Sequence, residues 1–172
     1  CYDNCDAVYG AAAEGGGAII MFSASAAGWV SVGGYNQSAV MCGEWTYLAA
    51  VGSDGTVERV TTFKGNAAKL IPYVLTRVEH DGSVSGSRYL VSAWQDGTVD
   101  FGGEVGSQMG YGKAVVVELT GELFAERRVV IADALNGCLI HGAYDGFGSI
   151  WLTLMSPVGL SAITPAGPLS AP

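Results

Sequence analysis

Ser53-Asp54-Gly55-Thr56-Val57 decides the fold, because it predicts a tight turn followed by the start of a returning β-strand. Asx-Gly suits a type I′ turn, in which both central residues need positive φ. The same form recurs at His80-Asp81-Gly82-Ser83-Val84 and Gln95-Asp96-Gly97-Thr98-Val99, and two further pairs lie between apolar runs, Asn136-Gly137 and Asp145-Gly146. The spacings are too irregular for a true repeat, but they predict antiparallel strands joined by hairpins.

The apolar runs between these turns are the expected strands, about nine to eleven in all. Glu44–Val51 is expected to pair with Thr56–Phe63, and Arg88–Trp94 with Thr98–Phe101 across the Asp96-Gly97 turn. Pro72 indicates an edge strand or a bulge, because proline cannot donate to a β-ladder. The other expected strands are one or two within Gly15–Val32, then Lys69–Val78, Lys113–Leu119 (rich in valine and predicted to be buried on both faces), Val129–Ala134, Cys138–Ala143 and Ser149–Met155.

The predicted fold class is therefore all-β, an antiparallel β-sandwich or barrel with Asx-Gly hairpins and little helix. A short helix is expected at Ala11–Glu14, ended by three glycines, with the β pattern beginning at Ala18. Glu122–Arg128 fits either two helical turns or a strand that follows a hairpin turn at Thr120-Gly121. The chain is divided into an N-terminal segment (1–17), a β domain (18–156) and an extended, proline-rich C-terminal arm (157–172).

The composition favours contact with other chains. Apolar residues make up 49% of the chain and charged residues only 14%, whereas about 25% charged residues is usual in soluble domains. Surfaces so poor in charge are typical of subunits that cover one another. We therefore expect a homo-oligomer or a larger assembly.

The sequence argues against nucleic-acid partners and against a membrane-spanning helix. The net charge is −8, and the basic residues are scattered except for Arg127-Arg128. Without a basic stripe to neutralise phosphates, we expect no nucleic-acid binding. No stretch reaches the roughly 18 uninterrupted apolar residues of a membrane helix.

Four cysteines, an even count, permit two disulfides with three possible pairings: Cys1, Cys5, Cys42 and Cys138. Cys42 and Cys138 lie in apolar runs and equally suit buried thiols. Asn36-Gln37-Ser38 is a glycosylation sequon. The chain starts at Cys1 without a methionine, as expected after processing or numbering from a cut point. Together these features favour an extracellular, cell-surface or virion protein.

Cysteine chemistry gives the sharpest catalytic hypothesis. Cys1 as an N-terminal nucleophile would use its own α-amine as the base, but such hydrolases need helical layers that this pattern does not predict. Cys138 and His141 are three apart, so on a strand they face opposite sides and cannot act as a pair.

Other catalytic patterns are weaker. The acidic residues Asp96, Asp100, Asp81 and Asp145 are better explained by turns than by a paired-carboxylate site. The glycine-rich stretch Phe101–Lys113 lacks the spacing of a phosphate-binding loop and is expected to be a flexible binding or contact loop. We therefore expect a protein that is not an enzyme, with no cofactor and no metal site.

The aromatic residues and the C-terminal arm complete the functional prediction. The four tryptophans fall in expected strands and suit core packing, a sugar-stacking face or an interface. The uncharged arm is expected to lie against its own domain or a neighbour, through Pro157, Leu160, Ile163, Pro165, Pro168 and Leu169. The leading hypothesis is a structural subunit of an extracellular or virion assembly, such as a coat, decoration, fibre or filament protein. The alternatives are a secreted carbohydrate-binding β module and the Cys1 hydrolase.

Overall fold

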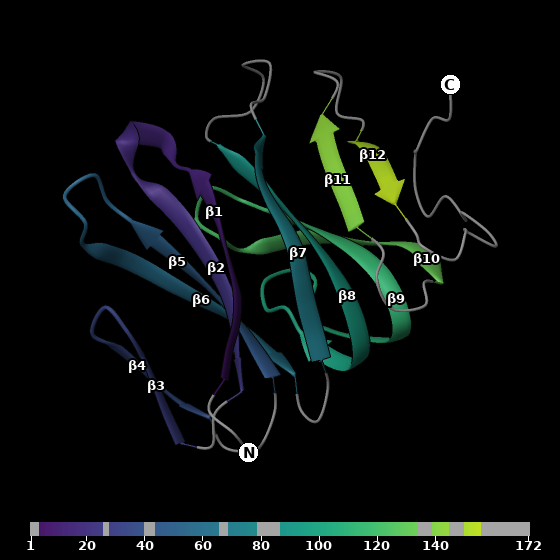
Figure 1. The fold of residues 1–172 in the computed structure, drawn as a ribbon, viewed down its shortest axis with the longest axis horizontal. Helices are drawn as coiled ribbons and strands as arrows, with labels where there is room; N and C mark the ends of the chain where they lie inside the picture. The colour runs from purple at the N-terminus through teal and green to yellow at the C-terminus, as the bar shows by residue number, and fades with distance from the viewer. Residues whose placement is uncertain are drawn as a thin grey trace.

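The computed structural model describes residues 4–25, 28–39, 44–65, 69–78, 87–133, 139–144 and 150–155. These residues form twelve β-strands and a single turn of 3-10 helix (Figure 1). Every strand pair is antiparallel. The all-β prediction is confirmed.

The strands are β1 (Asn4–Ala12), β2 (Ala18–Ser25), β3 (Gly28–Val32), β4 (Tyr35–Ala39), β5 (Glu44–Val51), β6 (Val57–Gly65), β7 (Lys69–Val78), β8 (Arg88–Asp100), β9 (Ser107–Leu119), β10 (Ala125–Asp133), β11 (Leu139–Tyr144) and β12 (Ile150–Met155). The described residues contain one strand more than the nine to eleven expected, and β1 and β4 were not predicted.

Eight strands form the main sheet, in the order β1-β2-β5-β6-β8-β9-β10, with β7 also paired to β8. The hairpins β3–β4 and β11–β12 are separate two-stranded sheets. In Figure 1, β1, β2, β5 and β6 lie on one side and β7 to β10 on the other. Only the last two residues of β6 pair with β8, Lys64 with Asp100 and Gly65 with Val99, so this corner joins the two parts.

The core lies between these two parts of the sheet. Alternate residues of each strand face it, as the two-residue period of a strand requires. The first part contributes Ile19, Met21, Leu48 and Phe63, and the second contributes Leu70, Tyr89, Val91, Ala93, Val99, Val115, Val117 and Leu119. Burial of these apolar side chains supplies the main stabilisation of the fold.

Strand β7 pairs with β8 alone among the described strands, and a bulge lies between Pro72 and Val74. The edge position and bulge predicted from Pro72 are confirmed. The backbone carbonyl of Leu70 in this strand accepts hydrogen bonds from the hydroxyls of Ser23 and Thr46 at 3.3 and 3.2 Å. These hydroxyls, on β2 and β5, tie the two parts of the sheet together by polar contacts inside the protein.

The segment Ala114–Leu119 of β9 is buried throughout. Val115, Val117 and Leu119 belong to the core, whereas Val116 and Glu118 are buried on the opposite face. On β8, Leu90 and Ser92 are likewise buried away from the core. The prediction that this valine-rich strand is buried on both faces is confirmed. Strand β11 lies close to β7 and β8 without pairing with either.

The expected turn at Asp96-Gly97 is wrong. Strand β8 runs without a break from Arg88 to Asp100, and a register shift lies between Gln95 and Gly97. Gly97 has φ of 89°. From Gln95 to Gly97 β8 advances two residues while β9 advances three, from Lys113 to Gly110, so the shift is a β-bulge whose extra residue lies in β9. Because β8 pairs with β9 on both sides of the bulge, the chain continues as a strand at Gly97 and does not turn back.

The expected helix at Ala11–Glu14 is also wrong. Ala11 and Ala12 belong to β1, which pairs with β2, so residues 4–12 are part of the main sheet and precede the predicted β start at Ala18. Only Glu14–Gly16 form a 3-10 turn, and Gly15 and Gly16 have positive φ. Pairing with β2 overrides the helix propensity of alanine.

At Asp54-Gly55 the predicted hairpin between β5 and β6 is confirmed, but its turn type is not I′. Only Gly55 has positive φ there. Its N–H donates to Gly52 O at 3.0 Å, and the Gly52 N–H donates to Thr56 O at 2.8 Å. This is the pattern of a longer hairpin loop that ends in a left-handed glycine. The hairpin turn at Thr120-Gly121 is also found, and β10 follows it in place of a helix.

Several predictions lie outside the described residues. They concern the turns at Asp81-Gly82, Asn136-Gly137 and Asp145-Gly146, the residues Cys1, Cys42, Cys138 and His80, and the whole arm 157–172. Cys5 is described only as backbone within β1. Among the described residues, no helix has the length and apolar character needed to cross a bilayer.

Candidate interaction surface

Strands β8 and β9 extend beyond β7 and β10 as a ribbon, which among the described strands only the last two residues of β6 join, at Val99 and Asp100 of β8. Gly97–Asp100 pairs with Ser107–Gly110 in continuous register. Strand β10 pairs with β9 only from Lys113 to Leu119, so Ser107–Gly112 has no partner on its other side among the described strands. We call Gly97–Gly112 the distal ribbon.

One face of the distal ribbon is exposed and carries two large apolar side chains. Met109 and Tyr111 are 65% and 67% exposed, and because they are two residues apart they share a face. Thr98, Asp100 and Ser107 are exposed on the same face. Residues 105–112 contain no charged side chain, so the outer strand of the ribbon is an uncharged, partly apolar surface.

The base of the ribbon is fixed by Gln95, which is fully buried. Its Oε1 accepts bonds from Arg128 Nε at 2.9 Å and Nη2 at 2.6 Å. Its Nε2 donates to Gly97 O at 3.0 Å and to Gln108 O at 2.7 Å. One carboxamide thus bridges the bulge, both strands of the ribbon and β10, with every polar group satisfied.

Arg128 reaches this site from β10 and is half-buried. Its guanidinium also lies 5.9 Å from the centre of the Phe101 ring, a cation–π distance. Burial lowers the pKa of Arg128 from its ordinary value because desolvation disfavours the charged form. Gly110 makes room for the guanidinium, since a Cβ there would lie 2.8 Å from Nη2.

The loop at the end of the ribbon is tightly bonded. Phe101 is buried, and its ring packs edge-on against Phe63 with centroids 5.1 Å apart. The Phe101 N–H donates to Gly106 O, and the Gly102 N–H donates to Asp100 Oδ1 at 2.9 Å. Because β9 begins at Ser107, the flexible loop expected over Phe101–Lys113 is wrong for all but its first six residues.

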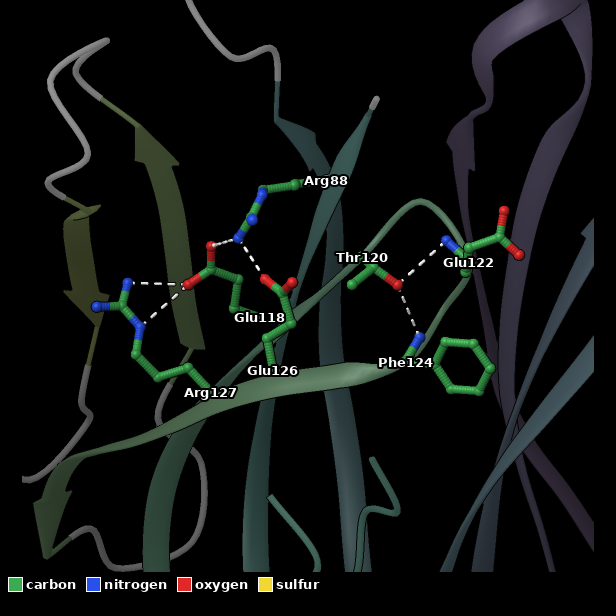
Figure 2. A network of polar contacts seen from close by, with 7 residues as sticks. All are labelled: Arg88, Glu118, Thr120, Glu122, Phe124, Glu126 and Arg127. Carbon is green, nitrogen blue, oxygen red and sulfur yellow. Dashed lines mark hydrogen bonds and ion pairs between the residues drawn. The ribbon is translucent and has the colours of Figure 1, made fainter. Parts of the chain in front are cut away.

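A second polar site lies on the same strands, on the face opposite the core. Glu118 of β9 is nearly buried and bonds two arginines, Arg88 of β8 at 2.6 Å and Arg127 of β10 at 2.9 Å (Figure 2). Arg88 also pairs with Glu126. We call these four residues the charge cluster; its formal charges cancel, and it links three neighbouring strands.

The β9–β10 turn beside the cluster is held by the Thr120 hydroxyl, which accepts the N–H groups of Glu122 and Phe124 at 3.2 and 3.1 Å (Figure 2). Leu123 has φ of 64°, a rare conformation for a bulky residue. Its side chain is fully buried in the core, while Phe124 is 53% exposed. Core burial of Leu123 offsets the backbone strain.

Other predicted site residues are not brought together. Trp45 is half-buried; its Nε1 donates to Gly65 O at 3.2 Å, and Lys64 Nζ lies 5.8 Å from its ring centre. The Trp45 ring is therefore already in contact with Lys64 of its own chain. Asp100 belongs to the ribbon loop, and no metal-binding group of three His, Cys, Asp or Glu occurs within the part of the chain that the structure describes. Asn36, of the sequon, has an exposed side chain on β4.

Gln95 and Arg128 were missed by the sequence analysis. Their sequence neighbours gave no signal, because the two residues lie 33 positions apart and meet only when β9 brings β8 and β10 together.

Comparison with known proteins gives no match: no family model, no curated protein and no solved structure is significantly similar to this chain.

Proposed function

We propose that this protein is a structural subunit that assembles with copies of itself through the distal ribbon. The observation that carries the proposal is the pair Met109 and Tyr111, exposed side by side on a strand segment without charge and without a described partner on one side. Exposed and uncharged strand edges favour pairing with another chain.

The charge of the whole chain supports this choice of surface. With a net charge of −8, copies repel one another except where the surface is neutral. Residues 105–112 supply such a surface, and aromatic and methionine side chains are enriched at the centres of interfaces. The buried Gln95–Arg128 contacts hold the ribbon in place before contact, which reduces the entropy lost on association.

The test is the native mass of the full chain, measured by light scattering, with negative-stain images of the same sample. We expect particles larger than the 17.7 kDa chain. The double variant Met109→Lys/Tyr111→Lys should be monomeric. The matched control Val8→Lys/Phe124→Lys adds the same charge at two other exposed apolar positions, and should assemble like the wild type. A monomeric wild type, or equal loss in both variants, would overturn the proposal.

A carbohydrate-binding module is the second candidate. Tyr111 is an exposed aromatic side chain, and Thr98, Asp100 and Ser107 place polar groups on the same face. Sugar sites combine a stacking ring with such polar neighbours. A monomeric wild type that binds immobilised glycans, and loses binding in Tyr111→Ala while Phe124→Ala retains it, would favour this function over assembly.

The proposed location is outside the cell, on a cell surface or in a virion. The exposed side chain of Asn36 supports this proposal, because glycosylation needs an accessible asparagine. Expression through a eukaryotic secretory pathway should give a glycosylated chain whose mass falls on glycosidase treatment. Asn36→Gln should remove that difference, and an unmodified wild-type chain would count against this location.

A further inference from the structure

We propose that the partner at the distal ribbon is a strand, residues 158–164 of a second copy, added to the side of β9 at Ser107–Gly112 that no described strand pairs with. This inference rests on the proposed function and names its mode of contact. Exchange of an identical segment between copies is a low-cost route to assembly because it requires no additional domain.

The acceptor is the edge of β9. Strand β10 pairs with β9 only from Lys113 onward. Beyond that point about half of the backbone N–H and C=O groups of Ser107–Gly112 point away from β8. The segment contains neither a lysine nor a proline, two common protections of an edge, and its bulge is confined to the end next to Lys113. It therefore offers the backbone groups that an added strand needs.

The donor is argued from the sequence that follows β12. Residues 156–172 carry no charge. Between Pro157 and Pro165 lies the proline-free run Val158-Gly159-Leu160-Ser161-Ala162-Ile163-Thr164. Every residue in it retains its N–H, and at roughly 3.3 Å per residue its seven residues match the six of the acceptor in length. The flanking prolines limit the added strand to this run.

The side chains and the charge of the donor run and of the acceptor segment support the proposed pairing. Residues opposite each other on neighbouring strands share a face, so alternate residues of the run would flank Met109 and Tyr111 and cover part of their exposed surface. Donor and acceptor are both neutral, which suits contact between copies that each carry a charge of −8. Because each copy gives one strand and receives one at a different place, the contact is head-to-tail and leads to a ring or a filament.

The experiment uses two full-length variants that block opposite halves of the contact. Leu160→Pro/Ala162→Pro removes donor N–H groups from the run and keeps the edge. Met109→Lys/Tyr111→Lys places charge on the edge and keeps the run. Each variant alone should stay monomeric, and their mixture should form a 1:1 complex of twice the 17.7 kDa chain mass. Ala166→Pro/Ala171→Pro, outside the run, is the control and should assemble like the wild type.

The outcomes separate the two proposals. If the wild type assembles but Leu160→Pro/Ala162→Pro assembles equally well, or if the mixture gives no complex, the strand exchange is wrong while self-assembly stands. If the wild type is a monomer, the proposed function fails and the exchange with it. Circular dichroism of each variant confirms that loss of assembly does not reflect unfolding.

Discussion

The two halves of the β8–β9 hairpin differ in the burial and the charge of their polar groups. The proximal half, Arg88–Gln95 with Lys113–Leu119, is largely buried and contains charges, which pair with one another around Glu118. The distal ribbon is exposed yet has an uncharged outer strand, and its base is fixed by a neutral amide, Gln95. The comparison teaches that the paired charges of this hairpin lie in its buried half, whereas the outer strand of its other half is uncharged. Buried charges are tolerated where partners surround them, and the neutral surface is left where contact between chains is proposed.

The largest expected effect comes from breaking the charge cluster. Glu118→Ala removes the carboxylate that Arg88 and Arg127 share, and leaves their guanidinium groups partly buried with fewer acceptors. Loss of one partner of a buried ion pair should lower the free energy of unfolding by about 3 kcal/mol. Urea denaturation measures it.

The control for this change is another glutamate-to-alanine substitution on the surface. Glu122 pairs with Arg59, but its side chain is 62% exposed, so Glu122→Ala should change stability by less than about 0.5 kcal/mol. Equal losses in the two variants would show that burial does not set the contribution of these ion pairs.

The next effect tests the base of the distal ribbon. Gln95→Leu keeps the volume but leaves Gly97 O and Gln108 O without their donor and Arg128 without its acceptor. Unsatisfied buried groups should lower stability by about 2 kcal/mol. Hydrogen exchange should become faster at the amides of the ribbon more than at those of Ala114–Leu119. Uniform acceleration along both halves would contradict a local role for Gln95.

A smaller effect is expected from filling the space above the guanidinium. In Gly110→Ala the new Cβ would lie 2.8 Å from Arg128 Nη2. This atom is held by Gln95, so the clash should cost about 1 kcal/mol. Gly10→Ala is the matched control, because its Cβ would meet nothing closer than 3.8 Å, and thermal unfolding should show little change. A stabilised Gly110→Ala would mean that Arg128 moves freely.

Sequence alone predicted the strands well and the special positions poorly, for a physical reason. Asp54-Gly55 and Asp96-Gly97 share the same local pattern, and both glycines have positive φ, yet one lies in a hairpin loop and the other inside β8, opposite a bulge in β9. Local chemistry gives both glycines a positive φ. The length of the partner strand decides whether the chain reverses at the glycine or continues as a strand. Likewise, the alanines at Ala11 and Ala12 favour a helix until β2 pairs with them.

The candidate surface depended even more on long-range contacts. The exposure of Met109 and Tyr111 follows from where β10 stops pairing with β9, at Lys113. No residue within 107–112 signals that point, because the sequence Ser-Gln-Met-Gly-Tyr-Gly fits either a loop or a strand. The sequence did indicate, through its low charge, that some surface of this kind should exist.

The smallest effect sharpens the comparison with a fully exposed carboxylate. In the β5–β6 loop the pKa of Asp54 lies below its ordinary value of 3.8, first because the Thr56 backbone N–H donates to it and then because the Thr56 hydroxyl does. A lowered pKa in the folded state contributes stability above pH 3.8 that is lost as the pH falls through the folded-state pKa. Thr56→Val removes only the hydroxyl, so an NMR titration should show the pKa rising part of the way toward 3.8. A pKa that returns fully to 3.8 would show that the hydroxyl is the main cause of the lowered pKa. No rise in the pKa would show that the backbone hydrogen bond alone lowers it. In either case the effect on stability should stay well below that of Glu118→Ala, because solvent screens the exposed Asp54 while burial leaves Glu118 dependent on its arginine partners.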